Sequence, residues 1–304
     1  MRGATLQVGP DRPLLMAIVN ATPDSFSDPS GDGAVAPEAA LADRALELAA
    51  AGATLVDVGG ESGRTDRPAV PEPEEIRRVV PIVARLAEEG VLVSVDTWRA
   101  GVARAALAAG AAMVNDPSGL SDPAVADICA EAGAALVITH TSVPPKQKGF
   151  PGYRDVLADV RGLLADRAAE ARSLGVGEDQ LVLDPGIDLG KTPAETVAVL
   201  RGMGSLRSLG RPLLLAVSRK DFVGALTGRS PRERLGGTLA AVDAGLGAGA
   251  SILRVHDVAE VADYLRVRAA LRGEEEVPAD LGLDEDLRRE GAQEDGVVEE
   301  ERVA

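Results

Sequence analysis

Short apolar runs rich in Val, Leu and Ile alternate along the chain with longer, alanine-rich amphipathic stretches. An apolar run of about four to eight residues is typical of a buried strand, and apolar positions spaced three and four residues apart are typical of a helix. Strands are predicted at residues 14–19, 55–58, 91–95, 112–114, 136–138, 181–183, 213–217 and 252–255. Helices are predicted at residues 37–51, 73–89, 99–109, 123–132, 155–174, 193–209, 231–248 and 258–271.

This alternation predicts an α/β fold with parallel strands. Eight strand-helix units of roughly 34 residues each match a (β/α)8 TIM barrel, which typically needs about 250 residues. A doubly wound open sheet also alternates strands with helices and is the alternative. Polar residues directly follow nearly all of the predicted strands. Because the carboxyl ends of all barrel strands open onto one face, where barrel enzymes carry their chemistry, this placement favours the barrel.

Composition and charge divide the chain into three parts. Hydrophobic residues make up 45% of it but aromatic residues only 2%, so aliphatic side chains must build the core. The net charge is −16; residues 273–304 hold 13 acidic and 3 basic residues, a net −10, which leaves −6 for the rest. We therefore expect a lead-in at residues 1–13, one barrel domain at residues 14–272 and an acidic, disordered tail at residues 273–304.

The same numbers exclude several partners and favour a cytoplasmic protein. Strong net acidity argues against a nucleic-acid or anionic membrane surface, which needs clustered Lys and Arg. Cys129 is the one cysteine, so no internal disulfide forms and a reducing compartment is expected. No apolar run approaches the roughly 20 residues of a membrane span, and the N-terminus lacks a signal-peptide core.

Six strand-end motifs carry the chemistry. In order, they are residues 20–28 (Asn-Ala-Thr-Pro-Asp-Ser-Phe-Ser-Asp), 94–97 (Ser-Val-Asp-Thr), 114–116 (Val-Asn-Asp), 184–192 (Asp-Pro-Gly-Ile-Asp-Leu-Gly-Lys-Thr), 218–220 (Ser-Arg-Lys) and 254–257 (Arg-Val-His-Asp). Together they make residues 14–271 resemble the dihydropteroate synthase family. The resemblance implies a homodimeric (β/α)8 enzyme of folate biosynthesis. Such an enzyme joins dihydropterin-methyl diphosphate to 4-aminobenzoate and releases diphosphate.

The residue types suit that reaction. A pterin presents an amino group and a ring N–H that need a carboxylate, and ring acceptors that need donors, which Asp184, Asn115 and Lys220 supply. Arg254 has a planar cation that can stack on the ring. Asp96 could stabilise positive charge developing at the reacting methylene. All five match the pterin site of the resembled family.

Diphosphate departure calls for positive charge. Mg²⁺, which prefers oxygen ligands, would neutralise the leaving oxygens, and Asn20 matches the family's metal-side residue. His256, together with Arg254, can donate to the diphosphate. The expected catalytic residues are therefore Asp96, Lys220, Arg254 and His256.

Residues 59–68 (Gly-Gly-Glu-Ser-Gly-Arg-Thr-Asp-Arg-Pro) differ from the family's Gly-Gly-Glu-Ser-Thr-Arg-Pro by an insertion. Ser62 is the expected substrate contact. Arg64 is the favoured contact to diphosphate, with Arg67 as the alternative.

Two further departures lie at strand ends. Thr139-His140-Thr141 stands where the family usually has a Met-His-Met segment, so the pterin pocket wall is expected to change. His140 itself is open to a structural or a functional role. Asp221 stands where many members have Ser. The favoured interpretation is that it caps the following helix and points away. The alternative is that it opposes the carboxylate of 4-aminobenzoate by about 1–4 kcal/mol.

These departures suggest an alternative function. Some actinobacterial second copies of the family have a similar Lys-Asp string and a Thr-containing segment after the fifth strand, and their enzymatic activity is doubtful. The alternative is thus a pterin-binding homologue that does not catalyse the condensation. A folate-dependent methyl transferase on the same barrel is a third reading, which would require a cobalamin-bearing partner domain.

Overall fold

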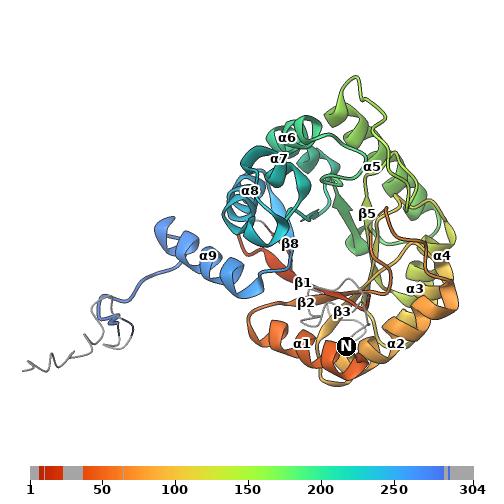
Figure 1. Ribbon diagram of the computed structural model, residues 1–304, viewed down its shortest axis with the longest axis horizontal. Helices are drawn as coiled ribbons and strands as arrows, with labels where there is room; N and C mark the ends of the chain where they lie inside the picture. The colour runs from red at the N-terminus through yellow and green to blue at the C-terminus, as the bar shows by residue number, and fades with distance from the viewer. Residues whose placement is uncertain (1–6, 10, 23–36, 64, 284–286, 288–304) are drawn as a thin grey trace, which may run out of the picture. The chain divides into compact units, whose positions relative to one another are not determined.

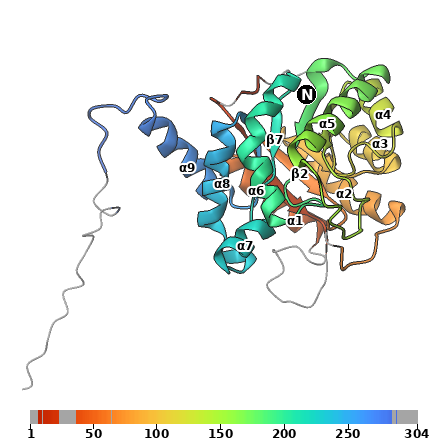
Figure 2. The same ribbon diagram turned by 90° about the horizontal axis from the view of Figure 1, so that it is seen from above.

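The computed structural model describes residues 7–9, 11–22, 37–63, 65–283 and 287. Within them, eight parallel strands pair in sequence order and close into a barrel, with helices around the outside (Figures 1 and 2). Pairing of the last strand with the first confirms the (β/α)8 barrel and excludes the open sheet. The strands are β1 Leu14–Asn20, β2 Leu55–Gly59, β3 Leu92–Asp96, β4 Met113–Asp116, β5 Ala135–Thr139, β6 Leu181–Asp184, β7 Leu213–Leu215 and β8 Ala250–Val255.

The helices follow the predicted ranges closely, with three differences. The helices are α1 Glu38–Ala50, α2 Glu72–Glu88, α3 Ala100–Ala108, α4 Ala124–Ala132, α5 Val156–Ser173, α6 Pro193–Gly202, α7 Asp221–Thr227, α8 Leu235–Gly247 and α9 Val258–Leu271. The first difference is that α7 lies outside every predicted range. The helix predicted at 193–209 is α only to Gly202 and continues as the 3₁₀ segment Met203–Leu209. The helix predicted at 231–248 begins with a separate 3₁₀ turn, Pro231–Glu233.

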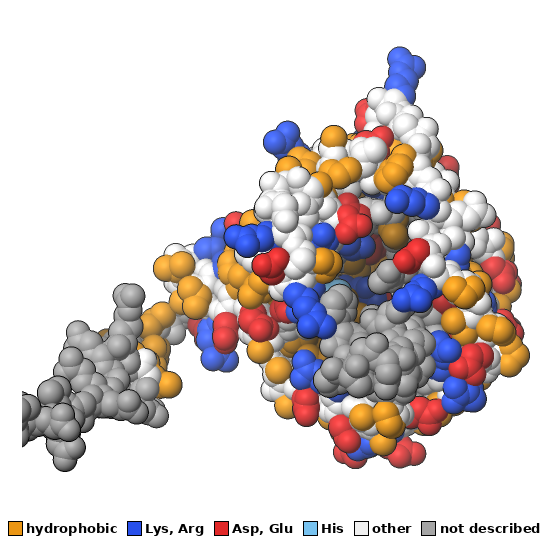
Figure 3. Space-filling model, in the orientation of Figure 1, with side chains coloured by type: hydrophobic (Ala, Val, Ile, Leu, Met, Phe, Trp, Pro, Cys, Tyr) orange, Lys and Arg blue, Asp and Glu red, His pale blue; other side chains and the backbone are white. Residues whose placement is uncertain are grey.

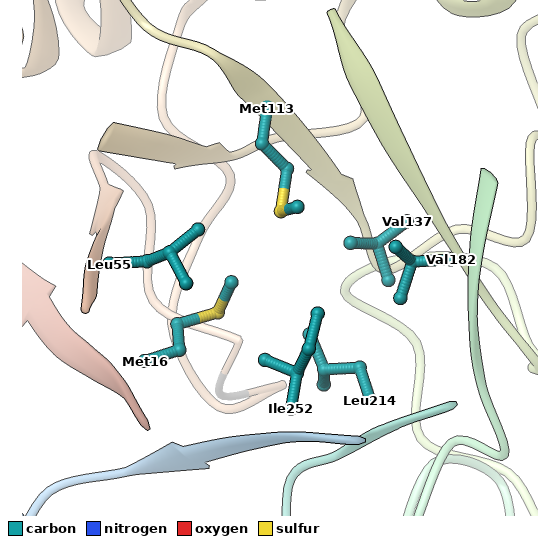
Figure 4. Close-up of a cluster of buried hydrophobic side chains, with 7 residues drawn as sticks. All are labelled: Met16, Leu55, Met113, Val137, Val182, Leu214 and Ile252. Atoms are coloured by element: carbon teal, nitrogen blue, oxygen red, sulfur yellow. The ribbon is translucent and has the colours of Figure 1, made fainter. Parts of the chain in front are cut away.

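The barrel interior is filled by a layer of aliphatic side chains contributed by seven strands. In Figure 4 these side chains point towards one another across the barrel. The layer consists of Met16, Leu55, Met113, Val137, Val182, Leu214 and Ile252. This buried layer forms an aliphatic core, as the low content of aromatic residues predicted.

The next interior layer is polar. Side chains alternate between the two faces of a strand, so a residue two positions beyond a core residue points into the barrel again. Two positions beyond Leu55, Met113, Val182 and Ile252 stand Asp57, Asn115, Asp184 and Arg254. The strand period thus places the polar groups directly on top of the apolar layer, at the carboxyl ends of the strands.

The chain divides into two compact units, Met1–Tyr264 and Leu265–Ala304, and the division falls within α9. Described residues 273–283 contain no helix or strand. Most of the expected tail, residues 284–286 and 288–304, lies outside the described residues, so the boundary after residue 272 stays a prediction. No helix in the described part of the chain is long and apolar enough to cross a membrane.

Replacing a residue of the apolar layer should destabilise the barrel. Leu214 is fully buried in that layer, so Leu214→Ala should lower the free energy of unfolding by about 2–5 kcal/mol through lost burial and a cavity. Leu226, which is 69% exposed on α7, is the matched control, and Leu226→Ala should change it by less than about 0.5 kcal/mol. Urea unfolding followed by circular dichroism measures both, and equal effects would contradict this account of the core.

Candidate functional site

Three of the predicted residues meet around Asp57, a fully buried carboxylate on β2. Its Oδ2 accepts a hydrogen bond from Nδ2 of Asn115 at 2.9 Å and one from Nε of Arg254 at 2.6 Å. Nη2 of Arg254 donates to Oδ2 of Asp96 at 2.7 Å. Strands β2, β3, β4 and β8 therefore bring one guanidinium, one amide and two carboxylates together.

Asp57 is a site residue that the sequence reasoning missed. The available signal was an aspartate inside an apolar strand, flanked by Val56 and Val58. A charged residue is almost never fully buried unless it is paired. The unusual position therefore pointed to partners from elsewhere in the barrel.

Two carboxylates share the one guanidinium of Arg254, which shapes the local electrostatics. Burial raises the pKa of Asp96 to about 7; the charge of Arg254 opposes this shift and the charge of Asp57 adds to it. Oδ1 of Asp57 is buried and has no hydrogen-bond partner among the described residues. A buried acceptor without a partner is unfavourable, so a ligand N–H at this atom would relieve a cost.

Asp184 and Lys220 form the second part of the polar layer. Oδ1 of Asp184 accepts a hydrogen bond from the backbone N–H of Gly186 at 2.7 Å. Burial raises the pKa of Asp184, opposed by the nearby ammonium of Lys220. Burial likewise lowers the pKa of Lys220, opposed by Asp188 and Asp184. Gly186 has φ +66°, and a Cβ there would collide with the carbonyl oxygen of His140, so only glycine fits this turn.

His256 is held by Ser218. Oγ of Ser218 accepts a hydrogen bond from the backbone N–H of His256 at 3.1 Å and lies 3.0 Å from its Nδ1. The hydroxyl hydrogen can therefore be donated to Nδ1, which leaves the ring proton on Nε2. Burial, then the charges of Arg254 and Arg219, lower the pKa of His256 to about 4. His256 is thus a neutral N–H donor at ordinary pH.

The remaining predicted contacts lie around β1 and the segment after β2. Asn20 ends β1 and pairs with Gly59 of β2. The side chains of Asn20 and Asp96 both lie against Gly59: a Cβ at Gly59 would be 3.4 Å from Oδ1 of Asn20 and 3.5 Å from Cβ of Asp96. Asn20 therefore borders the Asp96 side of the site. Ser62 is partly buried just after β2, and Arg67 is exposed.

Part of the predicted site lies outside the described residues. Arg64 does so, and so do residues 23–28 of the first motif. The choice between Arg64 and Arg67 as the diphosphate contact therefore stays open.

His140 is built into the support of the site. It is fully buried, its Nε2 lies 2.8 Å from Oδ1 of Asp159, and its Nδ1 lies 2.8 Å from Nζ of Lys191. Nζ of Lys191 also donates to the carbonyl oxygens of Gly186 and Leu189 at 2.8 and 3.1 Å. Burial and the Lys191 charge lower the pKa of His140 to about 4. Of its two predicted roles, the contacts favour the structural one.

The expectation that Asp221 caps α7 is wrong, although its side chain does point outward to solvent. Its side chain makes no cap hydrogen bond; it is 91% exposed and pairs with Nη1 of Arg234 at 2.9 Å. The N–H of Phe222 instead donates to Oδ2 of Asp188 at 3.1 Å. Asp188 takes the place of a local cap because the segment after β6 folds over the start of α7.

Lys and Arg side chains lie in and around the hollow in the middle of the face shown in Figure 3. Arg219, which follows β7, is held at this end of the barrel by an ion pair with Asp257. The site thus combines a buried carboxylate and amide layer with cations above it. That arrangement can bind a flat heterocycle rich in N–H groups together with an anionic group.

Comparison with known proteins agrees with this geometry. The family model described as "Pterin binding enzyme" matches residues 16–256, most of the chain. The chain therefore belongs to the family of pterin-binding enzymes that includes the dihydropteroate synthases.

Individual relatives define its neighbourhood within that family. The chain is 39% identical to dihydropteroate synthase of Bacillus subtilis, over 86% of this chain and 89% of that protein. It is 41% identical to "Inactive dihydropteroate synthase 2" of Mycobacterium tuberculosis, over 88% and 85% of the two chains. It is also similar to the structure of Xanthomonas albilineans dihydropteroate synthase with 4-aminobenzoic acid, at 41% identity and a TM-score of 0.80, over 88% and 95%.

Both histidines should stay neutral well below pH 6. Their lowered pKa values mean that the unfolded chain binds more protons between about pH 6.5 and pH 4, so stability should fall as the pH drops through this window. The chain has two histidines, so NMR titration of their Cε1–H signals, assigned with His256→Gln, measures both directly. A midpoint above pH 6 for either ring would contradict the described contacts.

Proposed function

We propose that this protein is a dihydropteroate synthase, which condenses (7,8-dihydropterin-6-yl)methyl diphosphate with 4-aminobenzoate. The observation that carries the proposal is the buried polar layer in which Arg254 bridges Asp57 and Asp96 beside Asn115 and Asp184. The names of the relatives support it, as does a similar structure described as Xanthomonas albilineans dihydropteroate synthase in complex with 7,8-dihydropteroate.

Each group of the layer has a part in binding the pterin. Because Nδ2 of Asn115 donates to Asp57, its Oδ1 is left to accept an N–H from the ring. The carboxylate of Asp184 accepts from the amino group and a neighbouring ring N–H, and Lys220 donates to the ring oxygen or nitrogen. The matching of donors with acceptors selects a pterin over a purely apolar ring.

The reaction breaks the C–O bond between the pterin methylene and diphosphate. The amine nitrogen of 4-aminobenzoate forms the new C–N bond and then loses a proton. Positive charge that develops at the methylene is stabilised by the carboxylate of Asp96, which Arg254 already holds in place. Catalysis then rests on positioning and charge, with no covalent enzyme intermediate.

The leaving diphosphate needs donors and a cation. His256, a neutral ring, would donate an N–H to the diphosphate, and Arg219 and Lys220 would add positive charge. Mg²⁺ would supply neutralisation of the leaving oxygens when bound, and Asn20 would hold it through its amide oxygen. Among the described residues no group of three or more His, Cys, Asp or Glu side chains could hold a metal ion. That fits an ion held mainly by substrate phosphates and water, as Mg²⁺ commonly is.

We further propose that the enzyme is a cytoplasmic homodimer acting on small molecules. The single cysteine supports a reducing compartment: Cys129 is buried, and burial raises the pKa of its thiol to about 12, so it is an inert structural residue. The homodimer follows from the resemblance to the family.

Purified protein with Mg²⁺ and both substrates should release diphosphate and form dihydropteroate. Lys220→Ala should lower kcat/KM by at least about 100-fold, because the ring acceptors lose their charged donor while the fold is kept. Lys148→Ala, which removes an exposed lysine of the segment between β5 and α5, is the control and should leave kcat/KM unchanged. A coupled diphosphate-release assay measures both. Absence of turnover at saturating substrates would refute the proposed activity.

The second candidate is a pterin-binding protein without synthase activity. Asp221 is the observation that favours it, since its charge lies at the start of α7, where N–H groups would otherwise attract the carboxylate of 4-aminobenzoate. Relatives described as inactive are as similar to the chain as the named synthases. The ion pair with Arg234 and the exposure of Asp221 weaken this repulsion.

Calorimetry on Asp221→Ser separates the two candidates. For an active synthase, the variant should bind 4-aminobenzoate at most about fivefold more tightly, because a screened charge contributes about 1 kcal/mol. Asp43→Ser is the matched control, since Asp43 is also an exposed carboxylate paired with an arginine, Arg85, away from the site. A gain of about 100-fold, from a wild-type protein that binds pterin but hardly any 4-aminobenzoate, would support the inactive homologue.

A further inference from the structure

Lys146, in the segment between β5 and α5, contacts the segment that follows β2. Its Nζ donates to the carbonyl oxygen of Ser62 at 2.8 Å and lies 3.7 Å from Oε1 of Glu61. The two side chains are enclosed, with exposed fractions of 12% for Lys146 and 2% for Glu61. A lysine from one barrel loop is thus inserted at the base of another.

Glu61 closes that base. Its Oε1 accepts a hydrogen bond from the backbone N–H of Val70 at 3.2 Å, which joins the two ends of segment 61–70. Its Oε2 accepts from Nη1 of Arg99 at 2.6 Å. Lys146, Glu61 and Val70 therefore meet at one point, the neck of segment 61–70, and the described residues 65–69 between them are exposed.

Lys146 adds a positive charge to a group of carboxylates at the neck. Arg99 pairs with Glu61 and also with Glu75, which is fully buried on α2. Glu61 and Glu75 are both enclosed, and an enclosed carboxylate without a paired cation is strongly unfavourable. Among the described residues, the ammonium of Lys146 lies beside Glu61 in addition to the guanidinium of Arg99.

The backbone of Lys146 is held in a conformation that side chains disfavour. Its φ is +65°, in the left-handed region. Described non-glycine residues with positive φ are Leu120, Lys146, Asp188 and Arg219, and they follow β4, β5, β6 and β7 in turn. Such backbone strain concentrates at functional loops, where the surroundings enforce it. The lysine at this strained position is the one whose Nζ contacts the neck.

We propose that Lys146 is a positioning residue that clamps the neck of segment 61–70 and so fixes its anion-binding groups at the barrel mouth. That segment carries the hydroxyl of Ser62 and the guanidinium of Arg67. The clamp makes the segment after β5 a determinant of affinity for the diphosphate end of the substrate. The affinity effect rests on the proposed function, whereas the clamping itself does not.

Hydrogen exchange tests the clamp without reference to activity. In Lys146→Met, backbone amides of residues 61–70 should exchange at least about tenfold faster than in the wild type. Lys148→Met removes a lysine two positions away whose side chain is exposed, and it should leave this exchange unchanged. Unchanged exchange of residues 61–70 in Lys146→Met would overturn the proposal.

Steady-state kinetics test the consequence for the substrate. Lys146→Met should raise the KM for dihydropterin-methyl diphosphate about tenfold and change kcat less than about threefold, since a positioning residue does not touch the reacting atoms. Equal losses in kcat with no change in KM would contradict the assigned role. A wild type without turnover would refute the proposed function and leave the exchange experiment to decide on the clamp.

Lys146→Arg is the control in case Lys146→Met destabilises the whole protein. The guanidinium keeps the positive charge and can still donate to Ser62 and Glu61. It should therefore restore protection of residues 61–70 to within about threefold of the wild type. If Lys146→Arg leaves the segment as unprotected as Lys146→Met does, the ion pair at the neck is not what holds it and the proposal fails.

Discussion

The site depends on the placement of one guanidinium between two buried carboxylates. Arg254 lies 197 residues from Asp57 and 158 residues from Asp96 in the sequence, and it donates to both. Buried charges are tolerated only when they are paired with good geometry. Closure of the barrel through β1 and β8 provides that geometry, so the same pairing that completes the sheet also assembles the polar layer.

The loops above this layer are joined to one another by individual side chains. Lys146 joins the segments after β2 and β5, and His140 with Lys191 joins those after β5 and β6. Asp188 joins the segments after β6 and β7, and Arg219 joins those after β7 and β8. Three of these residues have positive φ, which indicates that neighbouring loops enforce their conformations. The described loops at the mouth of the barrel are therefore preorganised.

Sequence reasoning succeeded where local pattern and strand geometry act together. It predicted Asn115, Asp184 and Arg254 as neighbours because parallel strands end at one face, and the structure places them in one interior layer. It missed Asp57, because an aspartate inside an apolar strand indicates that partners exist but does not identify them. The predicted cap at Asp221 was wrong because Asp188, distant in sequence, accepts the hydrogen bond from the first turn of α7 instead.

The sequence by itself determined the alternation of strands and helices, the aliphatic core and the polar groups at the strand ends. These follow from local period and residue type, which each segment carries on its own. Only the tertiary structure decided which charges are paired, which histidine is structural and which lysine holds a loop. Such pairings form between segments far apart in the chain, and burial gives them their strength. A local sequence pattern indicates neither which distant residues will lie close together nor how deeply they will be buried.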